Sequence, residues 1–71
     1  MTKELTKMQS LLVEAVITGD TNRASSLLPY MRRREVYLTP RAYAEHCSHD
    51  LEPEALLQHI EALDGFIRTV L

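Results

Sequence analysis

Residues 52–71 read EPEALLQHIEALDGFIRTVL, the stretch of the chain that most clearly predicts its own structure. Five apolar residues recur in it at intervals of four, three, four and three: Leu56, Ile60, Leu63, Ile67 and Val70. This is the a/d spacing of a helix that packs lengthwise against another helix. Most of the polar residues between them fall on the opposite side of that helix. The pattern therefore predicts helix packing and indicates no chemistry.

The chain has 71 residues, enough for one domain, and we expect a single helical domain over residues 1–71. Its composition, 45% hydrophobic and 25% charged, is that of a globular protein. No apolar run approaches the ~20 residues of a membrane span. The segment MTKELTKM lacks the apolar core of a signal peptide. Cys47 is the only cysteine, so no intrachain disulfide can form, and we expect a reducing, cytoplasmic location.

Two helices are expected in the first half of the chain. The first covers residues 3–18, where apolar residues recur every three or four positions. Gly19 suits the left-handed position that ends a helix, and Asp20 suits the N-cap of the next one. The second helix covers residues 21–34, and we expect Pro29 to kink it; the alternative is a break at that proline.

The middle of the chain is expected to hold a link and a short helix. Residues 36–38 are interpreted as an extended link. Thr39 and Pro40 fit the N-cap and the first position of a short third helix over residues 40–48. Tyr43, Ala44 and Cys47 would face inward on this helix. Asp50 fits the N-cap of the last helix.

These segments together predict an all-α fold, a small three-to-four-helix bundle with a kink or break at Pro29. The first, second and fourth helices would form the core, and the short third helix would cross one end. The predicted core consists of apolar residues that recur on one face of each helix: Leu5, Met8, Leu12, Val16, Leu27, Leu28, Met31, Leu56, Ile60, Leu63 and Ile67.

Three adjacent arginines, Arg32, Arg33 and Arg34, stand out as a charged segment, with Arg41 nearby in sequence. Guanidinium groups hold carboxylates and phosphates through bidentate hydrogen bonds. The segment is therefore compatible with an acidic protein partner, with a nucleic acid, or with a solvated helix end whose negative dipole the cations complement. The net charge of −2 argues against a domain built mainly to bind nucleic acid.

Metal-binding and catalytic chemistry have one candidate stretch, which contains His46, Cys47 and His49. A structural zinc site needs four ligands, and this spacing matches no standard zinc motif. A nucleophilic Cys47 would need a lowered pKa and a histidine base nearby. The sequence also offers no Gly-rich loop for an oxyanion or a phosphate. We therefore expect no catalytic residue, no metal and no cofactor.

A helix-turn-helix over residues 39–63 is a further alternative for binding DNA. Its reading helix would begin with Glu52, Pro53 and Glu54. Recognition helices present cationic or amide groups from that end, and two carboxylates there would repel DNA phosphates. The sequence therefore disfavours this motif.

Protein-binding residues are expected near the arginines and in the last turn of the chain. Tyrosine and arginine are favoured at interface hot spots, and the last turn of the apolar stripe has few neighbours to cover it. We predict a non-catalytic protein–protein interaction module, an adaptor, regulator or chaperone-like subunit that binds another protein or itself as a homodimer. The alternative is a nucleic-acid-binding regulator that uses the three arginines. The predicted partner-binding residues are Phe66, Ile67, Val70, Leu71, Tyr30, Tyr37, Arg32, Arg33 and Arg34.

Overall fold

A computed structural model describes residues 5–47 and 51–71 of the chain. The described residues form four α-helices and one short 3₁₀ helix: α1 (Lys7–Ile17), α2 (Thr21–Leu27), η1 (Leu28–Tyr30), α3 (Arg33–Cys47) and α4 (Pro53–Val70). The prediction of a small all-α bundle is confirmed. None of these described helices combines the length and apolar character required to cross a membrane.

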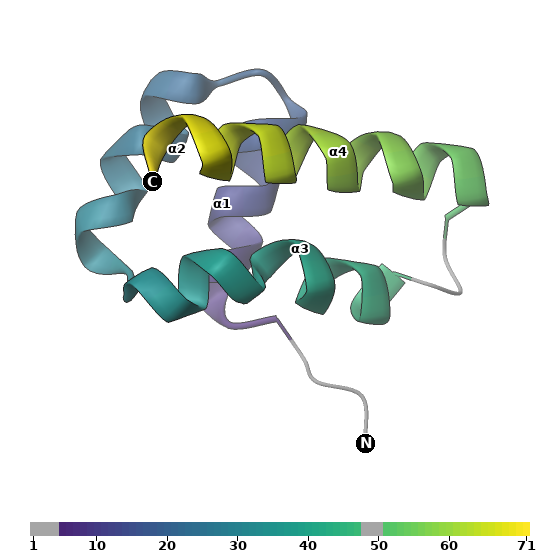
Figure 1. Cartoon of the computed structure of the whole chain (residues 1–71), viewed down its shortest axis with the longest axis horizontal. Helices are drawn as coiled ribbons and strands as arrows, with labels where there is room; N and C mark the ends of the chain where they lie inside the picture. Colours follow the sequence, from purple (N-terminus) through teal and green to yellow (C-terminus); the bar gives the residue numbers. More distant parts are fainter. Residues whose placement is uncertain (1–4, 48–50) are drawn as a thin grey trace.

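The helices are arranged as an antiparallel pair, α3 and α4, packed across α1 (Figure 1). The first helix also packs closely against α2, and η1 leads from α2 toward the start of α3. The prediction that a short third helix crosses one end of the bundle is therefore wrong. Helix α3 has 15 residues and packs along α4 as a full member of the core.

The first helix begins at a capping box formed by Thr6 and Gln9. The Thr6 hydroxyl accepts a hydrogen bond from the Gln9 backbone N–H, and the Gln9 side chain accepts one from the Thr6 N–H. These two bonds satisfy donors that a helix start otherwise leaves unpaired. The helix therefore starts at Lys7, later than the expected start at residue 3.

The turn between α1 and α2 follows the sequence prediction. Gly19 has a φ of +82°, and its N–H and that of Asp20 donate to the carbonyls of Val16 and Ala15. This is a Schellman motif, in which a left-handed glycine closes the end of a helix. Asp20 then caps α2, because its side chain accepts a hydrogen bond from the Arg23 N–H.

The chain breaks after Pro29, so the expected kinked helix over residues 21–34 is wrong. Helix α2 ends at Leu27, and Pro29 lies in η1, where its missing N–H is tolerated. Met31 is extended, with φ −115° and ψ 146°, and α3 begins at Arg33. The alternative of a break at this proline is the one that the structure adopts.

The segment that was expected to be a link is instead the first half of α3. Val36, Thr39 and Tyr43 are buried along one face of this helix. The Thr39 hydroxyl donates to the Glu35 carbonyl at 2.8 Å, so Thr39 caps no helix, and Pro40 lies inside α3. The predicted cap at Asp50 lies outside the described residues, and the N-cap of α4 is Glu52.

The core consists of two clusters of buried residues that Val16 and other half-buried residues surround. One contains Leu12, Ala15, Ala24, Met31, Val36 and Ile67, and the other contains Val13, Tyr43 and Leu63. Each of the eleven predicted core residues either belongs to a cluster or packs against one, so that prediction is confirmed. The inward position predicted for Tyr43 and Cys47 is also confirmed, while the list omitted mainly small residues and the part of the buried face of α3 that precedes Tyr43.

Candidate functional site: an arginine-lined groove

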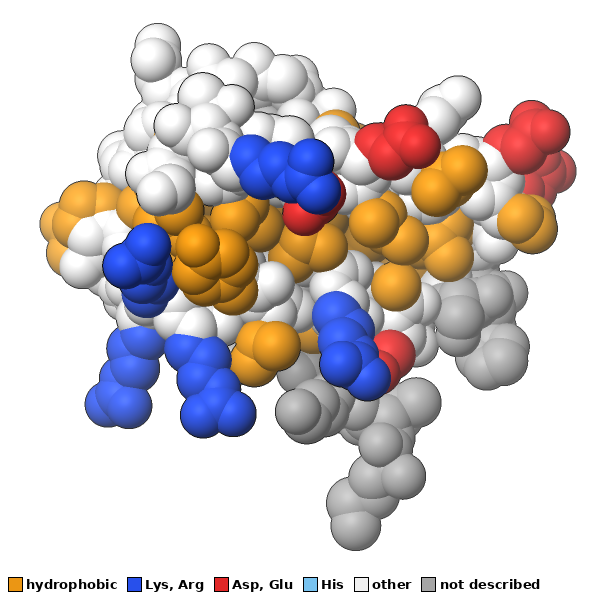
Figure 2. Space-filling model, in the orientation of Figure 1, with side chains coloured by type: hydrophobic (Ala, Val, Ile, Leu, Met, Phe, Trp, Pro, Cys, Tyr) orange, Lys and Arg blue, Asp and Glu red, His pale blue; other side chains and the backbone are white. Residues whose placement is uncertain are grey.

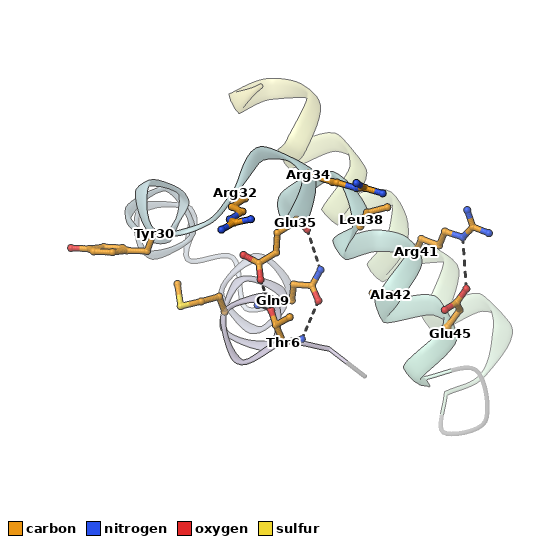
Figure 3. A pocket seen from close by; sticks show the side chains of 11 residues that line it. Thr6, Gln9, Tyr30, Arg32, Arg34, Glu35, Leu38, Arg41, Ala42 and Glu45 are labelled. Carbon is orange, nitrogen blue, oxygen red and sulfur yellow. Dashed lines mark hydrogen bonds and ion pairs between the residues drawn. The ribbon is translucent and has the colours of Figure 1, made fainter. Parts of the chain in front are cut away.

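An open groove of about 980 Å³ lies where α1, η1 and α3 meet (Figure 3). We call it the arginine groove, because three arginines line it. Its lining residues are Thr6, Met8, Gln9, Tyr30, Arg32, Arg34, Glu35, Leu38, Arg41, Ala42 and Glu45. The groove is shallow and exposed to solvent, so its shape suits an extended segment or a helix better than an enclosed small molecule.

A hydrogen-bonded network fixes α1 to the first turn of α3 beside the groove (Figure 3). The Thr6 hydroxyl donates to a Glu35 carboxylate oxygen at 2.8 Å, and Gln9 Nε2 donates to the Glu35 carbonyl at 3.1 Å. Gln9 is buried, and its side chain bonds both Thr6 and Glu35. The network therefore fixes the positions of α1 and α3, which form two walls of the groove, relative to each other.

The arginines lie at the N-terminal end of α3. At this position their interaction with the helix dipole is unfavourable, the opposite of what a helix C-terminus would give. Arg32 directly precedes the helix, and Arg33 and Arg34 open it. The N-terminus of a helix carries partial positive charge, which disfavours cations by about 0.3–1 kcal/mol each at the surface. The interpretation of these arginines as cations that complement a helix C-terminus is therefore wrong.

Two of the nearby arginines have local partners. The Arg33 guanidinium lies 5.8 Å from the centre of the Tyr37 ring, one helical turn along α3. Arg41 pairs with Glu45 at 3.7 Å, but both side chains are well exposed, so this ion pair stabilises little. Within residues 5–47 and 51–71, neither Arg32 nor Arg34 forms an ion pair. Their charges remain available to an anionic ligand.

The predicted contact patch at the end of α4 is only partly at the surface. Ile67 is 2% exposed and belongs to the core, so its assignment to a partner-binding surface is wrong. Phe66 is half-buried and packs against the same cluster, and Val70 is also half-buried. Leu71 is 42% exposed. The fold itself therefore uses most of this patch.

The three tyrosines occupy different environments. Tyr30 is 80% exposed at the mouth of the arginine groove, and Tyr37 lies under Arg33 on the surface of α3. Tyr43 is buried, and its hydroxyl lies 2.7 Å from Nδ1 of His59. Burial raises the pKa of Tyr43, and the neighbouring Cys47 acts in the same direction. The phenol is therefore held in its neutral form as a hydrogen-bonding group of the core.

The stretch that contains His46 and Cys47 forms the end of α3. Cys47 is half-buried and packs against the second core cluster. His46 is exposed, and His49 lies outside the described residues. In the part of the chain that the structure describes, no three His, Cys, Asp or Glu side chains gather as metal ligands would.

Sequence reasoning found the arginines and Tyr30 but missed the other half of the groove. Thr6 and Gln9 carry a readable signal, because Thr-x-x-Gln is the pattern of a capping box. Glu35 and Leu38 carry no such signal, because the sequence places both between the expected second and third helices.

No family model, curated protein or solved structure matches this chain. The fold and the groove define the chain as a small all-α bundle with an arginine-lined surface groove.

Proposed function

We propose that the chain is a non-catalytic protein-binding module that receives an acidic segment of a partner protein in the arginine groove. It would act as an adaptor, regulator or chaperone-like subunit. The groove combines the guanidinium groups of Arg32, Arg34 and Arg41 with the apolar surfaces of Tyr30 and Leu38. Carboxylates alternating with apolar side chains would match both features.

The observation that carries the proposal is the position of the arginines at the positive end of α3. Arg32 and Arg34 are exposed and lack an ion pair among the described residues, while the helix dipole repels them. The helix dipole therefore makes this position electrostatically unfavourable for the arginines within the fold itself. An anionic ligand would gain from the guanidinium groups and from the unpaired N–H groups of the helix start together.

A protein segment fits the groove better than a nucleic acid does. Glu35 and Glu45 also line the groove, and a regularly charged phosphate backbone would meet their carboxylates. A peptide can place its acidic residues beside the arginines and its neutral residues beside the glutamates. The proposal places the module in the cytoplasm, where the single Cys47 would stay reduced.

The test is a selection of random peptides on the full chain, followed by binding measurements on the enriched sequences by fluorescence anisotropy. We expect enrichment of Asp and Glu together with Leu or aromatic residues. The double variant Arg32→Glu/Arg34→Glu should bind these peptides at least ~10-fold more weakly, because two attractive contacts become repulsive. The matched control is Arg23→Glu, which reverses an exposed arginine of α2 outside the groove and should leave the affinity unchanged.

Equal binding by the wild type and the double variant would reject the groove as the site. The same titrations with a mixed DNA or RNA pool decide between partner classes. Binding of nucleic acid that weakens steeply with salt and depends on Arg32 and Arg34 would favour the alternative of a nucleic-acid-binding regulator.

A further inference from the structure

A second surface, separate from the arginine groove, runs along the seam between α3 and α4. Figure 2 shows hydrophobic side chains in a band along this seam, on the broad face of the molecule. Helical spacing places Tyr37, Pro40 and Ala44 on this side of α3, and Leu57, Ile60 and Leu71 on this side of α4 and its C-cap. We call these six residues the α3–α4 band. Tyr37 is 53% exposed, Leu57 is 56% exposed and Leu71 is 42% exposed, while Pro40, Ala44 and Ile60 are half-buried.

The two ends of the band carry opposite charges. Arg33 stands at one end, where α3 begins and α4 finishes, and Figure 2 shows Lys and Arg side chains concentrated there. Acidic side chains lie over the N-terminal half of α4 at the other end (Figure 2), and this half contains Glu52, Glu54 and Glu61. Between these ends, the exposed Arg68–Asp64 ion pair lies on the same face of α4 as Leu57. The band is therefore cationic at one end and anionic at the other, with an internally paired cation and anion between them.

These end charges have no ion-pair partner in the part of the chain that the structure describes. The ion pairs found among residues 5–47 and 51–71 are Arg41–Glu45 and Arg68–Asp64. Neither Arg33 nor the acidic residues at the start of α4 take part in them. A partner with the opposite order of charges along an apolar surface would complement the band over its whole length.

We propose that this partner is a second copy of the chain, bound through the α3–α4 band as a two-fold symmetric, antiparallel homodimer. A two-fold axis through the middle of the band turns one copy end for end. The Arg33 end of each copy then faces the Glu54 and Glu61 end of the other, twice in the same interface. Tyr37 lies beside Arg33 and Leu57 lies between Glu54 and Glu61, so Tyr37 of each copy is placed near Leu57 of the other.

Burial of Tyr37, Leu57 and Leu71 in a dimer would remove exposed apolar surface from water. A single-core domain of this length has little stability of its own, and oligomerisation is a common way to supply more.

The first test is sedimentation equilibrium of the full chain at concentrations up to about 100 µM, a range that also detects weak dimers. We expect twice the chain mass of 8.1 kDa. Leu57→Lys places a cation at the anionic end of the band, opposite the Arg33 end of the other copy, and should weaken the dimer by ~10-fold or more. The matched control, Ile17→Lys, changes a hydrophobic residue of α1 that is 36% exposed and lies outside the band, and it should remain dimeric.

The second test uses charge reversal to determine the orientation. Arg33→Glu alone and Glu54→Arg/Glu61→Arg alone should each be mainly monomeric, because each sets like charges against each other at both ends of its own homodimer. An equimolar mixture of the two variants should regain the dimer, since every end contact in the mixed pair is again attractive. Circular dichroism of each variant checks that it is folded.

A monomeric wild type at every concentration would overturn the proposal, and so would a dimer that Leu57→Lys leaves intact. Failure of the charge-reversed mixture to recover would overturn the antiparallel arrangement. The result is independent of the groove function, because Arg33 and Leu57 do not line the arginine groove and the peptide-binding test does not use them.

Discussion

The buried Tyr43 and the half-buried His59 show how a polar pair helps to specify the packing of a chain this small. The phenol hydroxyl and the imidazole Nδ1 lie 2.7 Å apart and join α3 to α4 inside the second core cluster. The two rings are tilted, with their centres 5.9 Å apart. A buried hydroxyl without a partner destabilises a fold, so this hydrogen bond favours one register of α3 against α4.

We predict that the stability of the protein falls above about pH 10 and that Tyr43→Phe reduces this fall. Burial raises the pKa of Tyr43 above its ordinary value of 10.0. As the pH rises past that value, the unfolded chain loses the phenol proton while the folded chain keeps it. The free energy of unfolding therefore decreases as the pH approaches the higher pKa of the folded state.

The measurement is urea denaturation of both proteins between about pH 8 and pH 11. Tyr43→Phe should cost about 1 kcal/mol near neutral pH through the lost hydrogen bond to His59, and its pH profile should be flatter than that of the wild type. Parallel profiles would show that Tyr43 does not control the alkaline transition.

The ends of the helices determine where the groove lies. The capping box at Thr6, the Schellman motif at Gly19 and the extended Met31 set the lengths and directions of the elements around it. Pro40 lies within α3 and cannot donate to the carbonyl of Val36, yet the helix continues through it. Burial of Val36, Thr39 and Tyr43 on both sides of this proline therefore outweighs the ~3 kcal/mol that an internal proline typically costs.

At this scale the two glycines should respond to the same substitution with opposite signs. Gly19→Ala should destabilise by roughly 1–2 kcal/mol, because φ +82° disfavours any residue with a Cβ. Gly65→Ala, inside α4, should stabilise by roughly 0.5–1 kcal/mol, because alanine restricts the unfolded chain and favours the helix.

An added Cβ meets no atom within 4 Å at either glycine, so the difference isolates the backbone conformation. Thermal unfolding followed by circular dichroism measures both changes at one protein concentration. Changes of the same sign at the two positions would contradict this explanation of the turn.

The stability of the whole molecule depends on a small core of two clusters. Leu63 is fully buried and packs in the cluster that contains Val13 and Tyr43, so it connects α4 with α1 and α3. Val16 packs against both clusters and joins them. We therefore expect the bundle to unfold as one cooperative unit.

Truncation of Leu63 should affect the entire fold. Leu63→Ala should cost ~2–5 kcal/mol, because it removes buried contacts and leaves a cavity. In a domain of this size such a loss lowers the melting temperature by about 10 °C or more. The control is Tyr30→Ala, which changes a side chain that is 80% exposed. This substitution should change the melting temperature by at most a few degrees. A small shift for Leu63→Ala would mean that α4 packs differently.

The sequence by itself determined the helical class, the inward faces of α1, α2 and α4, and the turn at Gly19 and Asp20. Those properties depend on apolar periodicity and on backbone chemistry within a few residues, which a sequence displays directly. Only the tertiary structure determined that residues 36–40 belong to α3. Thr39 and Pro40 locally resemble a helix start, and only contacts with α1 and α4 explain why they lie inside α3.

The same long-range packing decided the candidate surfaces. Extending α3 back to Arg33 moved the arginines from an expected helix end to a helix start, beside a groove wall supplied by Thr6 and Gln9. It also covered Ile67, which the periodicity of α4 left equally suited to core or interface. Helical periodicity indicates which side of a helix is apolar, and only the packed neighbours determine how much of that side remains exposed.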